Sequence, residues 1–544
     1  MHNMILNTRN LFLMLLAFIC TLSANADLKP RFNDDTPASV KIRMMNEFSE
    51  MRKSARTPYT VGSRETAPLK SFGSPKIPVV LVQFADLKFT ISSADSVNYK
   101  FDLFSNGTRN GVRYTGAGSY GSVRDYFAAQ SDSIFLPEFV VIGPVTLNEG
   151  YAYYGKNSGN TKDVNISKFY NEAITEVTKM GIDWKNFDND GDGIIDMVYF
   201  IYAGVGENDS QNNDPYVIWP KEGGSGKYGG WNFGACACSN ELFRGQLDGI
   251  GPMCHELSHA LGLPDFYDVK YVAYGLDYWD IMDSGCYCSV GQCPCNYSAY
   301  EREFMGWGRL VTLDAGIGQN VTVYPIDDSR GVGYKIVNNE NPNEYYVVEN
   351  RQNSGWDRRI GFRSGNTYGL NHGLMVTHIQ FVEGRWTGNN VNTDPKHQLI
   401  TLIPADSTLH STLYVNQDRA WSMEENIYVT GYDADFCYRS AAGDLYPGIT
   451  GKTDLQGRKA FVYSDTGETP HMMNQPITDI EEHEDGSITF KFCGGDLTYV
   501  KDVRYSGRNT DEGIFDMQGR RVSFDKNQLK RGFYIINGRK ALVK

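Results

Sequence analysis

The sequence has no excess of positive charge and, beyond its first residues, no long apolar run. Its 544 residues include 52 Lys and Arg against 65 Asp and Glu, a formal net charge of −13. Nucleic-acid-binding proteins usually carry a basic face, so this balance argues against such a partner. The absence of a later apolar stretch of about 20 residues argues against a transmembrane segment. The chain also lacks a repeat of fixed period and a low-complexity tract.

Cysteine is sparse, with ten in the chain, but most of it is clustered. In an oxidising compartment such clustering predicts disulfides that hold loops together. A thiolate zinc cluster is the alternative, because paired C-x-C steps can bind metal. A separate bridge between Cys437 and Cys493 is also open. Without Cys20 nine cysteines remain, so we expect one unpaired thiol and assign it to Cys254. The clustered residues are Cys236, Cys238, Cys254, Cys286, Cys288, Cys293 and Cys295.

The first 26 residues have the features of an export signal. Arg9 precedes an apolar stretch from Leu11 to Leu22, and Ala24-Asn25-Ala26 offers a cleavage site with small residues. The stretch is too short to span a bilayer. The residue before Cys20 is Ile19, whereas a lipoprotein signal requires a small residue there. We therefore predict a cleaved signal peptide at 1–26 and no lipid anchor.

The remaining length is more than one core usually organises, so several domains are expected. Residues 27–74 are polar and predict a pro-segment or N-terminal extension. Apolar runs at 77–84 and 197–203 predict buried strands, and 166–177 predicts a helix with one apolar face. These elements indicate a mixed α/β domain at 75–310. The predicted apolar face consists of Phe169, Tyr170, Ala173, Ile174 and Val177.

Short strand patterns separated by turns follow from residue 311 to residue 495 and predict one or more β-rich accessory domains. The expected strands include 321–324, 345–349, 374–379 and 488–492. Residues 500–544 have a strand pattern of their own, which predicts a small β-sandwich at the C-terminus.

The segment HELSHALGLPD at 255–265 has the spacing of a zinc site. His255 and His259, at i and i+4, project from one face of a helix and can bind one tetrahedral ion. Glu256 lies on an adjacent edge, where it can polarise a metal-bound water. Gly262 can take the left-handed conformation that ends the helix. The chain then turns back and can bring Asp265 to the ion as a third ligand, with water in the fourth position.

Other residues of this segment support the helix. Pro252 suits its first turn, and Pro264 prevents its continuation. An ordinary surface helix with two solvated histidines is the alternative. Downstream, Met282 lies in the polar segment WDIMDSG at 279–285. A Met in such a turn can lie beneath the zinc ligands as an apolar base, as in the Met-turn of metzincins.

A second candidate metal site lies in the sequence DNDGDGIID at 188–196. Carboxylates alternate there with Gly residues, and a backbone carbonyl is available, as in calcium loops. The twelfth position is Tyr199 where an EF-hand has Glu, so the loop is not a complete EF-hand. An acidic turn without metal is the alternative. We predict structural calcium bound by Asp188, Asp190, Asp192, Ile194 and Asp196.

Taken together, residues 78–307 resemble the immune-inhibitor-A-like family of secreted metallopeptidases. The resemblance implies a metzincin-like zincin fold with zinc at His255, His259 and Asp265 and Glu256 as general base. Asp268 is a competing third ligand, and Tyr287 is a candidate to stabilise the oxyanion. The cysteine-rich loop at 286–295 departs from the family pattern. The segments that carry the resemblance are 122–127, 151–155, 187–193, 255–268, 279–285 and 297–302.

The C-terminal segment 513–544 resembles the sorting domains of the type IX (Por) secretion system of Bacteroidetes. This resemblance implies the outer-membrane secretion machinery as a partner and the cell surface or exterior of a Gram-negative bacterium as the destination. A β-sandwich without a sorting role is the alternative. No cysteine lies in 27–74, so a thiolate in the predicted pro-segment cannot keep zinc latent.

We therefore predict a secreted zinc-dependent endopeptidase that hydrolyses peptide bonds in extracellular proteins. Two other functions are open. One is a surface adhesin that uses its β-rich half and keeps an inert zincin domain, against which the intact Glu256 argues. The other is zinc-dependent hydrolysis of a non-peptide ester or amide.

Overall fold

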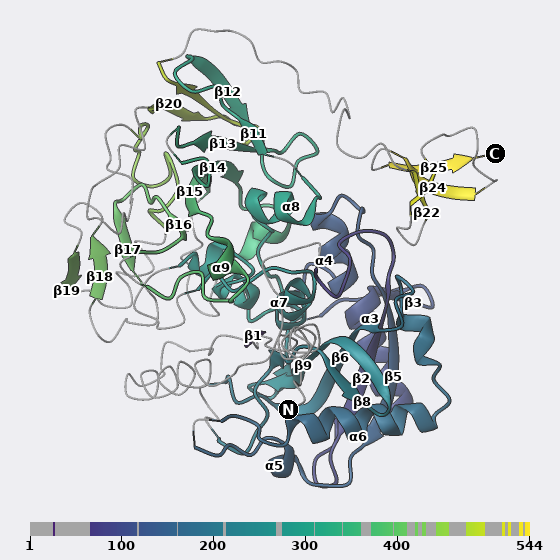
Figure 1. Ribbon diagram of the computed structural model, residues 1–544. Helices are drawn as coiled ribbons and strands as arrows, with labels where there is room; N and C mark the ends of the chain where they lie inside the picture. Colours follow the sequence, from purple (N-terminus) through teal and green to yellow (C-terminus); the bar gives the residue numbers. More distant parts are fainter. Residues whose placement is uncertain are drawn as a thin grey trace, which may run out of the picture.

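The computed structural model is shown in Figure 1. Residues 1–25 and 28–65, and with them most of the predicted signal peptide and pro-segment, lie outside the described residues, as do Asp268 and Cys437. The structure describes residues 26–27, 66–116, 119–159, 161–209, 214–267, 275–308, 310–339, 341–360, 372–394, 397–410, 419–422, 427–430, 442–455, 475–494, 514–516, 521–523, 532–536 and 539–543.

The first part of the chain is built on a mixed sheet in the order β1-β7-β9-β6-β2-β5, with β8 and β10 paired to β9. The central strands β9, β6, β2 and β5 are parallel, whereas β7 joins β9 antiparallel. The strands are β1 (Ala26–Asp27), β2 (Lys76–Gln83), β5 (Glu138–Thr146), β6 (Ile195–Val205), β7 (Lys221–Glu222), β8 (Gly226–Tyr228), β9 (Trp231–Phe243) and β10 (Gln246–Leu247).

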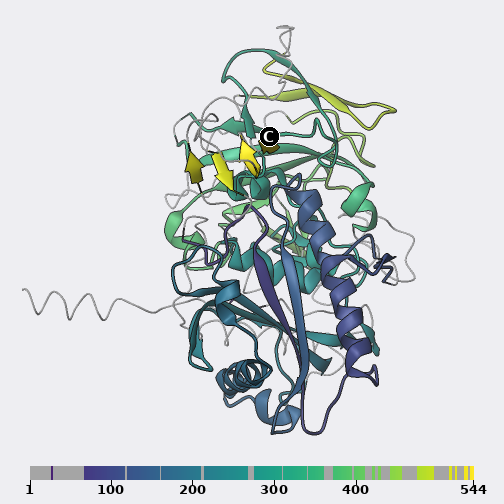
Figure 2. The ribbon, with the colours of Figure 1, turned by 90° about the vertical axis from the view of Figure 1, so that its right-hand side faces the viewer.

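Helices cover both faces of this sheet, because the side chains of its strands alternate between two apolar clusters. Val79 and Leu81 of β2 pack on the side of α3, α4 and α7, and Val80 and Val82 pack on the side of α5 and α6. Figure 2 shows α3 and α4 beside the purple strand β2 and the blue edge strand β5. The helices are α3 (Ala94–Asn106), α4 (Val123–Gln130), α5 (Tyr151–Tyr154), α6 (Ile166–Lys179) and α7 (Gly251–Ala260), and a short hairpin follows α3 with β3 (Thr108–Arg109) and β4 (Val112–Arg113).

The mixed α/β organisation predicted from the sequence is confirmed. The apolar runs at 77–84 and 197–203 form β2 and β6, and the periodic segment at 166–177 forms α6. Five residues of α6 are buried, and they are the five of the predicted apolar face.

The second part of the chain adds two further sheets. One has the order β11-β13-β14-β15-β16 and is antiparallel except for β11 and β13. The other has the order β12-β21-β20. The elements of this part are α8 (Ala299–Met305), β11 (Leu310–Thr312), β12 (Gln319–Val323), β13 (Gly333–Val337), β14 (Glu344–Arg351), β15 (Gly373–Gln380), α9 (Glu383–Trp386), β16 (Ile400–Leu402), β20 (Ile477–Glu482) and β21 (Ile488–Phe492).

One apolar cluster runs through both parts. It includes Val79 of β2 and Leu257 of α7 as well as Val348 of β14 and Phe490 of β21. Helix α7 thus lies between the α/β sheet below it and the green β-rich segment above it in Figure 1. The core therefore crosses position 310, where the sequence predicts a domain boundary.

Two smaller sheets complete the described strands. One contains β17 (Thr408–His410), β18 (Arg419–Ser422) and β19 (Ile427–Thr430). The other, drawn in yellow in Figure 1, contains β22 (Ile514–Asp516), β23 (Arg521–Ser523), β24 (Gly532–Ile536) and β25 (Arg539–Val543). The strands described in this part of the chain form one four-stranded antiparallel sheet, and the β-sandwich expected for residues 500–544 stays a prediction.

The predicted disulfides are wrong for six of the described cysteines, which have free thiols: Cys236, Cys238, Cys254, Cys293, Cys295 and Cys493. Cys236 and Cys238, two residues apart on β9, share one face of the sheet, and the other clustered cysteines belong to the apolar cluster on the opposite face. In that second group the thiols point to different backbone carbonyls: Cys286 to Asp283, at 3.3 Å, and Cys293 to Trp356, at 3.4 Å. Cys254 is a buried thiol, and no group of three metal-binding side chains among the described residues contains a cysteine.

Candidate metal centre

Helix α7 carries the HELSH sequence and is buried along its whole length. It begins beside the loop that follows it in the chain, since Gly251 N–H donates to Gly291 O at 2.9 Å. A Cβ at Gly251 would lie 1.8 Å from Cys286 O, so only glycine permits this approach. Pro252 occupies the first turn, as the sequence predicts.

The chain turns sharply at the end of α7. Gly262 has a φ of +107°, a region that favours glycine, and Leu263 N–H donates back to Ser258 O at 3.0 Å. The helix stop predicted at Gly262 is therefore confirmed. This turn returns the chain toward the helix and places Asp265 beside His255 and His259.

The three side chains converge through one atom each. His255 Nε2 and His259 Nε2 are 3.1 Å apart, and Asp265 Oδ1 lies 3.3 Å from the first and 3.2 Å from the second. Around a tetrahedral zinc with bonds of about 2.0–2.1 Å, ligand atoms are separated by about 3.3 Å. The triangle of donor atoms thus has the size that a single zinc ion requires.

The other ring nitrogens fix the tautomers. His255 Nδ1 lies 2.8 Å from Ile281 O, and His259 Nδ1 lies 2.7 Å from Leu263 O. A carbonyl oxygen can only accept, so both Nδ1 atoms carry the proton, and the Nε2 lone pairs face the metal position. Burial lowers the pKa of His259, although Asp265 opposes the shift. The neutral imidazole that results is the form that binds metal.

Glu256 follows the first histidine on α7 and is fully buried. Burial, and then the negative charge of Glu256, raise the pKa of Tyr199 in β6. Unlike the three converging residues, Glu256 does not belong to the ligand group. Glu256 thus lies on the same helix as the two histidines but outside the group of converging ligand atoms.

The backbone of the segment around Met282 accepts hydrogen bonds from two parts of the site, a histidine of α7 and the turn that contains Asp265. The carbonyl of Ile281 accepts from His255, and the carbonyl of Met282 accepts from Phe266 N at 3.0 Å. The Met282 side chain is buried. Two consecutive carbonyls therefore hold a histidine of α7 and the residue after Asp265.

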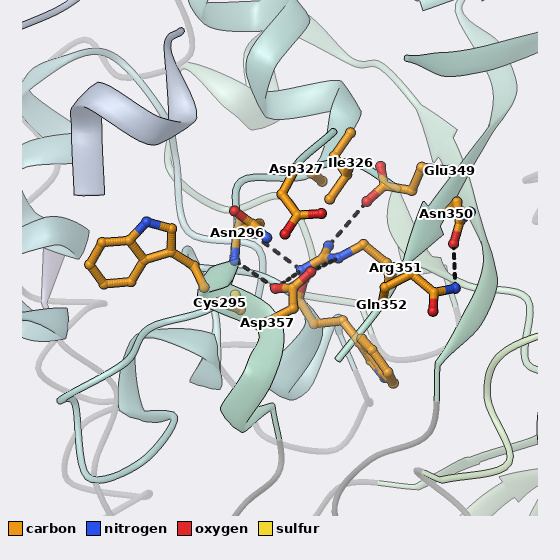
Figure 3. Close-up of polar contacts among 12 residues, drawn as sticks. Cys295, Asn296, Ile326, Asp327, Glu349, Asn350, Arg351, Gln352 and Asp357 are labelled. Carbon is orange, nitrogen blue, oxygen red and sulfur yellow. Dashed lines mark hydrogen bonds and ion pairs between the residues drawn. The ribbon is translucent and has the colours of Figure 1, made fainter. Parts of the chain in front are cut away.

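A buried arginine of β14 holds this segment in turn (Figure 3). Arg351 donates from Nη1 to Trp279 O at 3.1 Å and from Nη2 to Asn296 O at 3.3 Å. These hydrogen bonds hold both ends of the loop 279–296, which contains Met282. Glu349, which also pairs with Arg351, accepts from Ala299 N at 2.6 Å. The β-rich segment is thus connected to the loop that contains Met282.

The acidic loop at 188–196 brings together only part of its predicted ligand set. Carboxylate oxygens of Asp188, Asp190 and Asp196 lie within 4.8 Å of one another. Asp192 is outside this group, and its Oδ1 accepts from Ile194 N at 2.8 Å. Burial raises the pKa of Asp196 to about 7. The loop is thus a cluster of three acidic side chains, of which only Asp196 is buried.

Tyr287, the predicted oxyanion stabiliser, is half-buried in the short helix 284–287, and its hydroxyl accepts from Asn208 Nδ2 at 3.3 Å. Sequence reasoning did not single out Arg351 or Asn389, both of which contact the centre or its supporting loop. Asn389 bonds Asp265 across 124 residues. The turn sequence Gly388-Asn389-Asn390 is the one local signal, and it predicts a turn and not a partner.

Comparison with known proteins finds a family similarity in the first part of the chain. Residues 70–308 match the immune inhibitor A peptidase M6 catalytic domain. The M6-like segment therefore contains α7, Asp265, Met282 and the acidic loop, and it ends just before β11. The β-rich segment, with Arg351 and Asn389, lies beyond it.

Two relatives are similar to the same part. Immune inhibitor A of Bacillus thuringiensis subsp. alesti is 24% identical over 286 residues, 44% of this chain and 41% of that protein. The pre-pro-metalloprotease PrtV of Vibrio cholerae serotype O1 (strain M66-2) is 24% identical over 270 residues, 42% of this chain and 29% of that protein. The chain thus spans less than half the length of either relative.

Proposed function

We propose that this protein is a zinc-dependent endopeptidase of the secreted M6 type, with its metal held by His255, His259 and Asp265. The observation that carries the proposal is the triangle of Nε2, Nε2 and Oδ1 atoms with sides of 3.1–3.3 Å. The match of residues 70–308 to a peptidase catalytic domain, and a relative named a metalloprotease, support peptide hydrolysis.

When bound, zinc would supply an electrophile for the scissile carbonyl and a lower pKa for water. Glu256 takes a proton from the attacking water, since it is the carboxylate of α7 that is not engaged in the ligand triangle. His255 and His259 are kept neutral and oriented by the carbonyls of Ile281 and Leu263. We also propose that Met282 lies beneath the zinc ligands as an apolar floor and that Tyr287 stabilises the oxyanion.

The test is the Glu256→Ala variant, assayed on casein and a peptide library. We expect normal folding, normal zinc content and a loss of peptidase activity of several orders of magnitude, because Glu256 moves a proton and does not hold metal. Glu172, a carboxylate of α6 on the other face of the sheet, provides a control variant, Glu172→Ala, with activity retained. Near wild-type turnover without Glu256 would reject the mechanism.

We further propose that calcium binds the acidic loop as a structural ion. Asp188, Asp190 and Asp196 offer hard oxygens within reach of one cation. Asp196 is oriented by Asn189, whose backbone N–H and Nδ2 donate to its two oxygens at 3.2 and 3.0 Å. Asp192 and the backbone carbonyl of Ile194 would become further calcium ligands after a local rearrangement of the loop.

Export is the remaining part of the proposal. The signal-peptide pattern at 1–26 and the resemblance of 513–544 to type IX sorting domains support delivery to the exterior or surface of a Bacteroidetes-like cell. Within the described part of the chain, no helix has the length and apolarity to cross a membrane. Extracellular proteins and peptides are then the substrate class.

A further inference from the structure

Asn389 lies in the turn after α9, 81 residues past the end of the M6-like segment (389 − 308). Its side-chain amide contacts Asp265 twice. Asn389 Oδ1 accepts from Asp265 N at 2.7 Å, and Asn389 Nδ2 donates to Asp265 Oδ2 at 2.8 Å. Asn389 is 3% exposed and Asp265 1% exposed, so both contacts are shielded from water.

We infer that Asn389 is a positioning residue for the metal site: it sets the orientation of the Asp265 carboxylate and thereby raises the affinity for zinc. The inference rests on the proposed function, in which Asp265 is a ligand. Asp265 Oδ2 is engaged by Asn389 while Oδ1 faces the two Nε2 atoms. An amide is suited to this task because it offers one acceptor and one donor in a single plane.

The turn that presents Asn389 is built for that orientation. Asn389 has a φ of +48°, a left-handed conformation that asparagine adopts more readily than most residues. Its N–H donates to Trp386 O at 3.1 Å, which ties it to α9. Figure 1 shows α9, in green, near α7.

A second asparagine anchors the same turn. Asn392 Nδ2 donates to Phe266 O at 2.5 Å and to Ile400 O at 2.8 Å, and its Oδ1 accepts from Ile400 N at 3.1 Å. The turn is thus fixed to β16 on one side and to the residue after Asp265 on the other. The anchored turn holds the amide of Asn389 against Asp265, so the carboxylate should need little reorganisation to bind metal.

The consequence concerns the β-rich segment. The residue that orients a metal ligand belongs to that segment and not to the part of the chain that matches a peptidase catalytic domain. The β-rich segment is then required for full metal affinity, and the M6-like segment alone would be a weaker zinc site.

The experiment measures zinc affinity of the full chain by competition with a chromophoric chelator, without reference to peptidase activity. Asn389→Gly removes both contacts and keeps the left-handed backbone accessible. Asn389→Asp keeps the acceptor and puts a carboxylate oxygen against Asp265 Oδ2. We expect zinc affinity to fall about 10–100-fold in both variants, a magnitude typical of losing a residue that orients a ligand. Asn390→Gly, in the same turn, is the matched control with unchanged affinity.

A double-mutant cycle separates positioning from general destabilisation. In an Asp265→Ala background, Asn389→Gly should have no further effect on zinc affinity. Three results would overturn the inference. The first is an equal loss of zinc affinity from Asn389→Gly in the wild-type and Asp265→Ala backgrounds, and the second is wild-type zinc affinity of Asn389→Gly. The third is failure of both Asn389 variants to fold without metal. If the wild-type chain itself binds no zinc, the proposed function fails instead, so the two failures are distinguishable.

Discussion

Arg351 and Asp357 form a buried, bidentate ion pair, with Nε to Oδ2 at 2.7 Å and Nη2 to Oδ1 at 2.8 Å. Both side chains are at most 2% exposed. Asp357 Oδ1 also accepts from Asn296 N at 2.8 Å, so the pair and the Met282 loop are parts of one network. With its further contacts to Trp279, Glu349 and Asn296, the guanidinium of Arg351 uses all five of its N–H donors.

Removing the arginine should therefore destabilise the protein strongly. Arg351→Met leaves two buried carboxylates, Glu349 and Asp357, without their cation, and breaking a buried pair typically costs about 3–5 kcal/mol. Urea unfolding measures the change. The matched control is Arg330→Met, since Arg330 makes the same bidentate contact with Asp328, at 2.9 and 2.8 Å, on the surface. Solvent screens that pair, so little change is expected, and similar losses in both variants would contradict the structural reason.

Asp265→Ala should weaken zinc binding more than any change at Asn389, because it removes a donor atom and not the residue that orients it. The loss should exceed the about 10–100-fold typical of an orienting residue. Asp268→Ala, which changes the competing candidate ligand, should weaken binding less. Metal analysis after dialysis against a weak chelator measures both variants. Equal zinc occupancy in the two would remove Asp265 from the set of ligands.

Calcium should raise the melting temperature without being needed for peptide hydrolysis. An ion at 100 times its dissociation constant stabilises the folded state by about 2.7 kcal/mol. Asp190→Ala should abolish the increment, and Asp192→Ala should reduce it less, because Asp192 lies outside the group of converging carboxylates. Differential scanning calorimetry over millimolar calcium measures the effect, and no shift in the wild type would favour the acidic turn without metal.

The calcium effect should also depend on pH. The pKa of Asp196 is raised, mainly by burial, from 3.8 to about 7, so between these values the folded state holds a proton that the unfolded state releases. The stability of the metal-free protein therefore falls as pH rises through this window. Calcium requires the ionised carboxylate, and its increment should be larger at pH 8 than at pH 5.5. A larger increment at the lower pH would contradict this assignment.

Deleting residues 500–544 should change export and leave catalysis intact. The deleted part contains the small sheet β22 to β25, which pairs with no other described sheet. The predicted signal peptide would still direct the truncated chain across the inner membrane, so we expect active enzyme in the periplasm of the native host. Fractionation with an activity assay on each fraction measures this. Surface delivery of the truncated protein would reject a sorting role, and a folded but inactive product would reject catalytic independence.

The sequence by itself determined those features whose cause is local. The buried face of α6, the strands β2 and β6, and the end of α7 at Gly262 all follow from side-chain periodicity or from the backbone of one glycine. The proximity of His255 and His259 follows from helical spacing, and that of Asp265 from a turn of a few residues. In each case the interacting groups are close in the chain.

The tertiary structure alone decided the rest, because the contacts join residues far apart in the chain. No local pattern connects Asn389 to Asp265 or Arg351 to Trp279, since each contact depends on how the β-rich segment packs on α7 and the Met282 loop. The prediction of disulfides was wrong for the same reason, because it relied on positions along the chain. Clustering along the chain does not determine which way each thiol points, and the sheet places Cys236 and Cys238 on the opposite side from the remaining clustered cysteines.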